Sequence, residues 1–257
     1  MMRLYDTHCH FERADPTEIA AVLARAKAAG VEKLMAVGGS PALNESAALA
    51  VQVAEETVVS PKVCCAVGLD REQINKHRDT ETQSLSSPLC LNQKALGEIG
   101  LDYHYSPETR EAQLKLFGEQ LEEAKRRNLP VVIHTREADD DTLAILREIP
   151  SRGIIHCYTG TPEYAKRFLD LGFFISISGI VTFKPADNVR ASALVVPDDR
   201  ILIETDSPFL APVPMRGLPN EPAFIAHTCE FLAKLRGMSA DDFAELTFEN
   251  AERILAV

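Results

Sequence analysis

The sequence predicts an α/β protein, a single (β/α)8 TIM-type barrel over residues 1–257. Three observations support this prediction. The chain has 257 residues, 46% of them hydrophobic, which is close to the usual size of such a barrel. Short apolar runs alternate with helix-like segments along the whole length, and eight of the runs read as strands. Polar residues able to bind metal ions follow several of these runs, and barrel enzymes carry their chemistry at the carboxyl ends of the strands.

The first half of the chain contains four of the expected strands. They are the apolar runs 4–8, 31–37, 63–69 and 95–101. The first strand is followed by a helix that Asp15 caps, with Pro16 in its first turn and Gly30 at its end. A second helical pattern covers residues 47–56. Residues 71–91 are polar and rich in Ser, Thr and Gln, and their pattern indicates least about structure.

The second half supplies the other four strands. They are the runs 130–134, 153–156, 173–178 and 200–205. Ser106 is expected to cap a long helix from Pro107 to Asn128, whose apolar residues follow the helical period. Further helices are expected around 143–146, 162–171, 221–236 and 240–255, the last of them capped by Ser239. An open, doubly wound sheet is the alternative fold if one of the weaker strands is wrong.

Net charge limits how the protein can bind a substrate. The formal charge of -11 argues against a protein that wraps nucleic acid through a broad basic surface, because that mode depends on clustered Lys and Arg. A substrate with phosphate groups would have to be bound locally, by metal ions and a few basic side chains.

Targeting signals and cysteine usage predict a cytoplasmic protein. The sequence has no apolar signal region and no long hydrophobic span, so we expect no membrane association, and no obligate protein partner is implied. The six cysteines form no C-x-x-C pair and lie mostly within apolar runs. We therefore expect reduced thiols.

Two carboxylates end the last expected strand. Residues two apart on a strand share a face, so Glu204 and Asp206 are expected to point the same way. Desolvated acids need a positive partner, and the stretch 204–209 contains no Lys or Arg. A metal ion is the expected partner of Asp206, while Glu204, one pleat deeper, is expected at most to support the ligands.

Other potential ligands follow other strands. His8 and His10 come after the first strand, Glu98 lies near the end of the fourth, and His134 and His156 end the fifth and sixth. Taken singly, each has an ordinary interpretation: a pair of surface histidines, a solvated loop acid, or a core histidine bonded to a carbonyl. Their repeated occurrence at strand ends favours a shared metal site.

The donor set predicts hydrolytic chemistry. Imidazoles and carboxylates select zinc, manganese, iron or magnesium rather than calcium. Two ions held by such ligands would activate a water molecule and stabilise both the attacking and the leaving oxygen of a displacement. Asp206 is the candidate to take a proton from that water or to orient it, and Glu98, flanked by Gly97 and Gly100, can bridge two ions.

Basic and aromatic side chains near the same strand ends are candidates for substrate binding. Arg136, Lys184 and Arg216 can each hold a phosphate oxygen. Tyr103, His104 and Tyr158 can stack on a base. Each of these residues is about as often an ordinary solvated or packed side chain.

Together these motifs resemble the TatD family of metal-dependent deoxyribonucleases, a branch of the amidohydrolase-like barrels. The matching segments, in the order of the family, are 6–10, 97–103, 134–136, 156–160, 178–184, 204–208, 216–217 and 220–222. The resemblance implies a site with two divalent ions, magnesium, manganese or zinc, whose ligands are His8, His10, Glu98, His134, His156 and Asp206. Glu98 would take the bridging place that a carbamylated lysine holds in many relatives. The implied activity is the removal of nucleotides from DNA ends, 3' to 5'.

One segment departs from the family pattern. The family commonly has Gly-x-His-Pro-His after the third strand, whereas this chain has Gly68-Leu69-Asp70-Arg71-Glu72. An aspartate therefore replaces the histidine that helps to hold a phosphate or the hydrolytic water.

Two other functions remain open at this stage. One is hydrolysis of an amide or ester bond, such as an aminoacyl ester on tRNA, because the same kind of site can direct water at a carbonyl carbon. The other is a catalytically silent metal-binding or partner-docking barrel, since fold alone does not prove activity. The intact ligand set weighs against the silent barrel.

Overall fold

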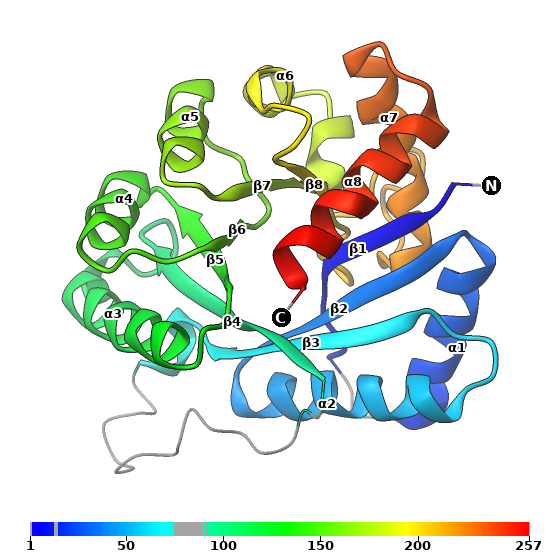
Figure 1. Ribbon diagram of the computed structural model, residues 1–257, viewed down its shortest axis with the longest axis horizontal. Helices are drawn as coiled ribbons and strands as arrows, with labels where there is room; N and C mark the ends of the chain where they lie inside the picture. The colour runs from blue at the N-terminus through cyan, green and yellow to red at the C-terminus, as the bar shows by residue number, and fades with distance from the viewer. Residues whose placement is uncertain (1, 13–14, 75–89, 91, 257) are drawn as a thin grey trace.

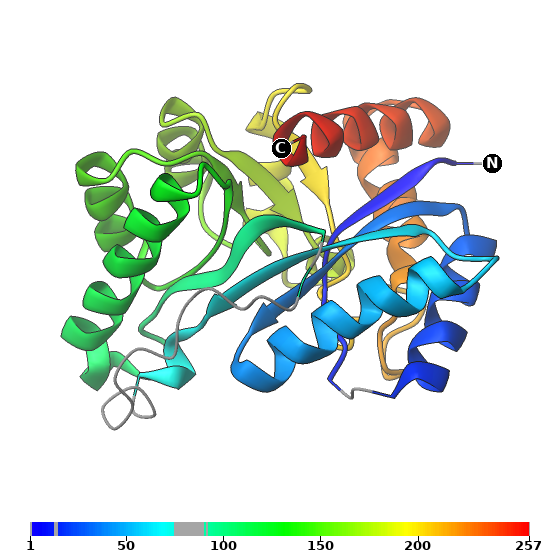
Figure 2. The same ribbon diagram turned by 60° about the horizontal axis from the view of Figure 1, so that its bottom comes forward.

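The computed structural model describes residues 2–12, 15–74, 90 and 92–256. Eight parallel strands form one sheet in sequence order, and helices surround it (Figures 1 and 2). The strands are β1 (Leu4–Cys9), β2 (Val31–Gly39), β3 (Lys62–Leu69), β4 (Gln93–Asp102), β5 (Val131–Arg136), β6 (Gly153–Ile155), β7 (Phe174–Ile177) and β8 (Ile201–Ile203). The predicted TIM-type barrel is confirmed, and the alternative of an open doubly wound sheet is wrong.

The barrel closes between β1 and the segment that follows β8. The amide of Asp206 donates a hydrogen bond to the carbonyl oxygen of His8 at 2.8 Å, and the amide of His10 donates to the carbonyl oxygen of Ser207 at 2.8 Å. β8 ends at Ile203, earlier than predicted, and the backbone at Asp206 turns into the left-handed region with φ of 55°. The closing contacts therefore involve the same segments that carry predicted ligands.

Helices follow the strands around the ring (Figure 1). They are α1 (Pro16–Ala28), α2 (Pro41–Glu56), α3 (Arg110–Arg126), α4 (Asp139–Glu148), α5 (Pro162–Asp170), α6 (Asp187–Val195), α7 (Ile225–Arg236) and α8 (Ala240–Leu255). Short 3-10 turns lie at η1 (Arg71–Gln73), η2 (Pro107–Thr109), η3 (Gly179–Thr182) and η4 (Pro222–Phe224). The predicted caps at Asp15 and Ser239 are confirmed, because each side chain accepts hydrogen bonds from amides in the first turn.

Three helical features differ from the prediction. α2 begins at Pro41, before its predicted start, because Ser40 caps it and proline suits the first turn. Ser106 does not cap a helix, since the chain first forms η2 and α3 begins only at Arg110. α6 lies where no helix was predicted, and no side chain caps its first turn.

The interior of the barrel packs against α8 through a buried apolar cluster. Inward-facing residues such as Tyr5, Met35 and Leu202 form a buried cluster with Phe248 and Leu255 of α8. Figure 1 shows α8 in front of the strands near the middle of the ring, where its apolar face meets this cluster. α8 thus covers apolar residues on the amino side of the strands, and the predicted ligands lie toward the carboxyl side.

The prediction of six reduced thiols is wrong for one pair. Cys65 and Cys90 form a disulfide, with Cα atoms 6.7 Å apart. Cys65 lies in β3, and Cys90 lies shortly before β4, which pairs with β3. Since the two cysteines are separated by 25 positions in the sequence, no short motif indicated that they meet. Four other cysteines, Cys9, Cys64, Cys157 and Cys229, are free thiols.

Two further observations concern the polar segment 71–91 and the character of the helices. Of the polar segment 71–91, only residues 71–74 and 90 lie within the described ranges, so the prediction for most of it falls outside them. None of the helices in the described ranges combines the length and the apolar character that crossing a bilayer requires.

Candidate metal centre

Glu98 lies between two pairs of histidines at the carboxyl ends of the strands. Its Oε2 atom is 3.5 Å from Nε2 of His8 and 3.5 Å from Nε2 of His10. Its Oε1 atom is 3.3 Å from Nδ1 of His134 and 3.3 Å from Nε2 of His156. One carboxylate oxygen therefore faces each pair, and strands β1, β4 and β5 together with the end of β6 bring the five side chains into one cluster.

Each pair of histidines is close enough to share one cation. His8 Nε2 and His10 Nε2 are 3.1 Å apart, and His134 Nδ1 is 3.2 Å from His156 Nε2. Each pair forms, with Glu98, a group whose donor atoms all lie within 4.8 Å of one another. The arrangement provides two neighbouring sets of nitrogen and oxygen donors joined by one carboxylate.

Asp206 adds a second carboxylate to the first set. Its Oδ1 atom lies 3.8 Å from Nε2 of His8 and 3.6 Å from Nε2 of His10. The side chain is 14% exposed, so solvent or a substrate can approach it. All six predicted ligands therefore lie in one cluster.

Neighbouring groups orient two of the histidines. His10 Nδ1 lies 2.9 Å from the carbonyl oxygen of Val37, so a proton on Nδ1 leaves Nε2 with a free lone pair. His134 Nε2 lies 3.1 Å from Oδ2 of the fully buried Asp102, which leaves Nδ1 facing Glu98. Such carboxylate and carbonyl contacts typically fix the ring of a metal-binding histidine.

Glu204 lies behind His156 at an ion-pair distance. Its Oε1 atom is 3.3 Å from Nδ1 of His156 and accepts a hydrogen bond of 2.7 Å from the amide of Cys157. The carboxylate is fully buried and points into the cluster rather than toward solvent. It also forms a possible donor group with His8 and His156, so its position allows more than a supporting role.

Asp102 is a site residue that the sequence analysis missed. The available signal was its place at the end of a buried strand, four positions after Glu98, within the segment already matched to the family. That signal was weak, because an acid at a strand end is also common where the chain returns to solvent.

Donor atoms that face each other at the centre indicate that a cation fits there. His8 Nδ1 and His156 Nδ1 are buried without a hydrogen-bond partner, but in both rings the atom that faces Glu98 is Nε2, so the fit rests on the Nε2 atoms and the carboxylate oxygens. Lone pairs facing each other at 3.1–3.5 Å also repel unless a proton or a cation lies between them. The residues present therefore suit divalent ions, which neutralise the carboxylates and satisfy the imidazoles.

Burial and neighbouring charges shift the pKa values in this cluster. Burial, together with the charge of His156, lowers the pKa of His8 to about 4, so the neutral form that binds metals dominates. Burial opposes ionisation of Glu98, but the charge of His156 and hydrogen bonds from His10 and His134 hold the pKa of Glu98 well below its ordinary value. Burial raises the pKa of Asp206 to about 6.

Neighbouring carboxylates favour the protonated form of His156. Burial disfavours the imidazolium, yet the charge of Glu98 and contacts with Glu204 raise the pKa of His156 well above its ordinary value. Metal ligands must be deprotonated, so binding of a cation would displace this proton.

The predicted substrate-binding residues differ in their position and exposure. Arg136 lies at the end of β5 with its Cζ atom 4.8 Å from the ring centre of Tyr105. Lys184 and Arg216 are exposed, and the Cζ atom of Arg216 lies 4.0 Å from the ring centre of Phe183. Within the described ranges these three basic side chains form no ion pair, and their role in substrate binding stays a prediction.

Tyr158 is not at the mouth of the barrel. Its side chain is 2% exposed and packs in the hydrophobic core, and its hydroxyl donates to the carbonyl oxygen of Thr161 at 2.7 Å. The prediction that Tyr158 binds substrate is therefore wrong. The backbone turns at Cys157, where φ is 45°, and this turn directs the next side chain inward.

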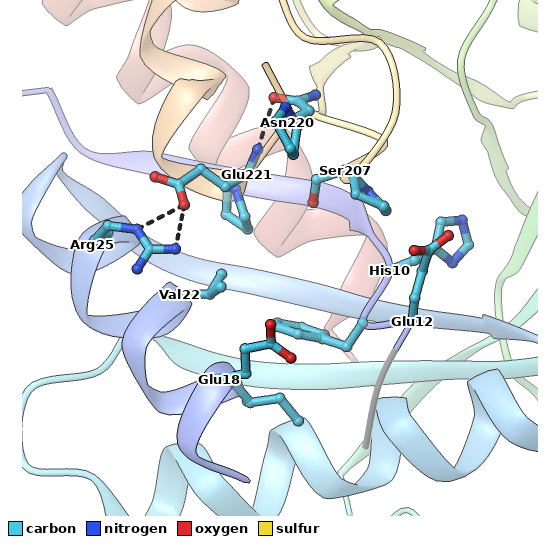
Figure 3. A pocket seen from close by; sticks show the side chains of 13 residues that line it. His10, Glu12, Glu18, Val22, Arg25, Ser207, Asn220 and Glu221 are labelled. Carbon is cyan, nitrogen blue, oxygen red and sulfur yellow. Dashed lines mark hydrogen bonds and ion pairs between the residues drawn. The ribbon is translucent and has the colours of Figure 1, made fainter. Parts of the chain in front are cut away.

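A pocket opens beside His10 (Figure 3). Its volume is about 420 Å³, and α1 and the segments after β1 and β8 line it. At one end Arg25 Nη2 pairs with Glu221 Oε2 at 2.6 Å. Glu12 and Glu18 also line the pocket, so its lining contains three carboxylates and one guanidinium. This balance favours a neutral or cationic group over a phosphate.

Comparison with known proteins identifies the family. The model of a family described as TatD related DNase matches residues 5–256, nearly the whole chain. The chain belongs to the TatD family. Two relatives are the metal-dependent hydrolases YcfH of Escherichia coli and YabD of Bacillus subtilis. YcfH is 37% identical over 265 residues, covering 100% of this chain and 97% of YcfH. YabD is 36% identical and covers 99% of both chains.

A solved structure supports the same assignment. The crystal structure of YjjV, a TatD homologue from Escherichia coli, has a TM-score of 0.85 and 31% sequence identity, and covers 99% of this chain and 98% of YjjV. This TatD-family chain is therefore a metal-dependent hydrolase by family, and its histidine and carboxylate cluster contains groups that can hold metal ions.

Proposed function

We propose that this TatD-family protein is a phosphodiesterase that uses two divalent ions to remove nucleotides from DNA ends, 3' to 5'. The observation that carries the proposal is Glu98, with one oxygen facing each histidine pair. Two cations a few ångströms apart are a common arrangement for displacement at phosphorus. The description of the matching family as a DNase supports the same substrate class.

The donor groups divide between the two ions. His8, His10 and Asp206 would hold one ion with one oxygen of Glu98, and His134 and His156 would hold the other with the second oxygen. Magnesium, manganese and zinc all suit these ligands. When bound, the ions supply the Lewis acidity that makes water a better nucleophile and neutralises charge on the phosphoryl oxygens.

Asp206 is the proposed general base. It is a carboxylate at the open side of the cluster, where it can take a proton from a water molecule that approaches the ligands. Glu98 would hold the centre together rather than carry protons, since its pKa lies well below the ordinary value.

Basic residues around the rim would bind the charged backbone of the substrate. Arg136 lies at the end of β5, while Lys184 and Arg216 follow β7 and β8 on another side of the mouth. Because the net charge is -11, phosphate binding has to depend on such local groups.

Metal removal tests the proposal directly. Protein stripped with EDTA should lose hydrolysis of end-labelled single-stranded DNA and regain it with magnesium or manganese, releasing mononucleotides from the 3' end. The Glu98→Ala variant should lose turnover by at least about 1,000-fold, because it removes the group shared by both ions. Glu123→Ala is a matched control, since Glu123 on α3 is similarly buried, at 6% exposure, but lies outside the cluster. No cleavage by folded, metal-loaded protein would reject the nuclease function.

Hydrolysis of an aminoacyl ester is the second candidate, and the pocket beside His10 favours it. Glu12 and Glu18 line that pocket and suit a positively charged amino group next to the metal centre. An amino acid p-nitrophenyl ester offers a simple assay. The second candidate would be favoured by two results together. The parent would hydrolyse this ester faster than Glu18→Gln does, and the parent would not cleave DNA.

A further inference from the structure

Tyr105 is exposed beside the metal centre between two guanidinium groups. Its side chain is 64% exposed, and the Cζ atoms of Arg71 and Arg136 lie 5.9 Å and 4.8 Å from its ring centre. Arg71 comes from η1 after β3, Tyr105 follows β4, and Arg136 ends β5. Three neighbouring strand ends therefore supply one aromatic ring and two fixed positive charges.

Asp102 links this group to the metal centre. Its Oδ2 atom is 3.3 Å from Nε of Arg71 and 3.1 Å from Nε2 of His134, so a single oxygen separates the guanidinium from a proposed ligand. Its Oδ1 atom accepts hydrogen bonds from the amides of His104 at 2.9 Å and Tyr105 at 3.0 Å. The same carboxylate thus positions both the proposed ligand and the backbone that carries Tyr105.

The chemistry of these side chains matches a nucleotide. Guanidinium groups bind phosphate oxygens through several donors, and an exposed tyrosine ring stacks on an unpaired base. Within the described residues, the Arg136 side chain makes no hydrogen bond or ion pair, and its guanidinium lies over the ring of Tyr105. By contrast, Arg110 pairs with Asp141 at 2.7 Å. The donors of Arg136 are therefore available to a phosphate.

We propose that Arg71, Arg136 and Tyr105 form a subsite for one nucleotide of a single DNA strand, next to the scissile bond. The guanidinium groups bind the neighbouring phosphate, and Tyr105 stacks on the base. This inference rests on the proposed nuclease function. It adds which residues hold the nucleotide next to the bond that is cut. Arg71 belongs to the segment 68–72 that departs from the family pattern, so its part in the subsite does not follow from that pattern.

Binding measurements with catalysis switched off test the subsite. The probe is a fluorescein-labelled single-stranded hexadeoxythymidylate, bound in EDTA and followed by fluorescence anisotropy at several salt concentrations. Tyr105→Ala should weaken binding by about 10-fold, and Tyr105→Phe, which keeps the ring, should restore it. Arg136→Met should lower the slope of log affinity against log salt by about 0.7, the value for one phosphate contact on a single strand.

Arg200→Met is the matched control. Arg200 and Arg253 flank Phe174 at 5.1 Å and 5.4 Å in a similar arrangement, but they lie at the amino end of β8 and on α8. The control should bind like the parent. Parent-like affinity and salt dependence in both Tyr105→Ala and Arg136→Met would overturn the subsite, as would failure of the parent to bind the probe.

A small substrate separates this inference from the proposed function. Bis(p-nitrophenyl) phosphate has no second phosphate, and its hydrolysis by the manganese-loaded parent reports on the metal centre alone. If the parent hydrolyses it while the variants bind DNA like the parent, only the subsite is rejected. If the parent cleaves no phosphodiester while the variants bind DNA more weakly, the nuclease function is rejected and the subsite stands.

Discussion

At the scale of single residues, Asp102 shows how a buried carboxylate can control a metal centre without belonging to the predicted ligand set. It is fully buried and touches His134 and Arg71 through one oxygen. Burial alone would raise its pKa, but the hydrogen bond from His134 and the contacts with the Tyr105 amide and Arg71 lower it to about 2. The group is therefore a permanent negative charge that orients an imidazole.

Replacing this carboxylate should weaken metal binding. We expect Asp102→Asn to lower metal affinity by about 10- to 100-fold, since groups that hold a ligand histidine usually contribute that much. Competition with a chromogenic chelator measures the effect without any enzyme assay. Asp187→Asn is the control, because Asp187 is an exposed acid paired with Arg190 on α6. Unchanged affinity in Asp102→Asn would show that His134 needs no such support.

Asp70, which replaces the family's usual histidine, should make stability depend on pH. Burial and then the charge of Glu98 raise its pKa to about 6, from an ordinary value of about 3.8. A folded-state pKa above the unfolded value means that the stability from proton binding is present below about pH 4 and is lost as pH rises through 6. In Asp70→Asn this loss is absent, while the hydrogen bond from the Glu72 amide can remain.

Urea unfolding in EDTA at pH 5 and pH 7.5 checks this expectation. Between pH 5 and pH 7.5 the parent should lose the stability that comes from protonated Asp70, and the variant should not. The difference in unfolding free energy, Asp70→Asn minus parent, should therefore be about 1 to 2 kcal/mol larger at pH 7.5 than at pH 5. Asp187→Asn should show no such increase. If the unfolding free energies of Asp70→Asn and the parent differ by the same amount at both pH values, Asp70 is not desolvated in the folded protein.

The candidate site could largely be predicted from sequence because its donors stand at strand ends. His8, Glu98 and His134 each follow an apolar run, and parallel strands bring such positions to one edge. Tyr158 was predicted wrongly, since nearness in sequence to His156 does not determine direction after the backbone turns at Cys157. The placement of Tyr105 depends on a hydrogen bond to Asp102 that no local pattern reveals.

At the scale of elements, the backbones of β4 and β5 lie very close together beside the site. Gly100 pairs with His134 and has φ of 137°, and a Cβ atom there would overlap the carbonyl oxygen of His134. The glycine thus lets the strand that carries Glu98 lie against the strand that carries His134.

Gly100→Ala should therefore destabilise the protein and its metal centre together. We expect a loss of at least about 3 kcal/mol in unfolding free energy, because both backbone strain and overlap with a strand oppose the methyl group. Gly172→Ala is the control, since Gly172 also has positive φ, 88°, but no atom lies within 4 Å of its Cβ position. It should cost only about 1 to 2 kcal/mol. Equal losses measured by urea unfolding would contradict the packing argument.

Elements with strong local signals could be predicted, and those defined by tertiary contacts could not. Asp15 with Pro16 correctly predicted the start of α1. α6 has no side-chain cap and only a short helical run, so its sequence resembles a loop. The disulfide between Cys65 and Cys90 depends on the neighbouring positions of β3 and β4, which are paired only in the folded barrel.

At the scale of the whole molecule, metal binding should stabilise the barrel. The donors come from β1, β4, β5, the end of β6 and the segment after β8, so a bound cation is available only to the folded chain. At 100-fold excess over Kd, one ion adds about 2.7 kcal/mol. For a chain of this size that corresponds to a rise in Tm of about 5 to 10 °C per ion.

Differential scanning calorimetry with EDTA or with manganese measures this rise. The Glu98→Ala variant serves as the comparison and should respond much less, because it lacks the carboxylate that both donor groups share. An equal rise in parent and variant would locate metal binding elsewhere in the protein.

The hydrogen bonds that join His8 to Asp206 and His10 to Ser207 also have a consequence for synthesis. The first and the last part of the barrel meet at one of the two donor groups, so a growing polypeptide cannot complete that group until translation has passed Ser207. The His134 and His156 group, by contrast, depends only on β4, β5 and the end of β6. A nascent chain that ends before Ser207 can thus assemble at most half of the centre, and the second donor group becomes complete only when the segment after β8 pairs with β1.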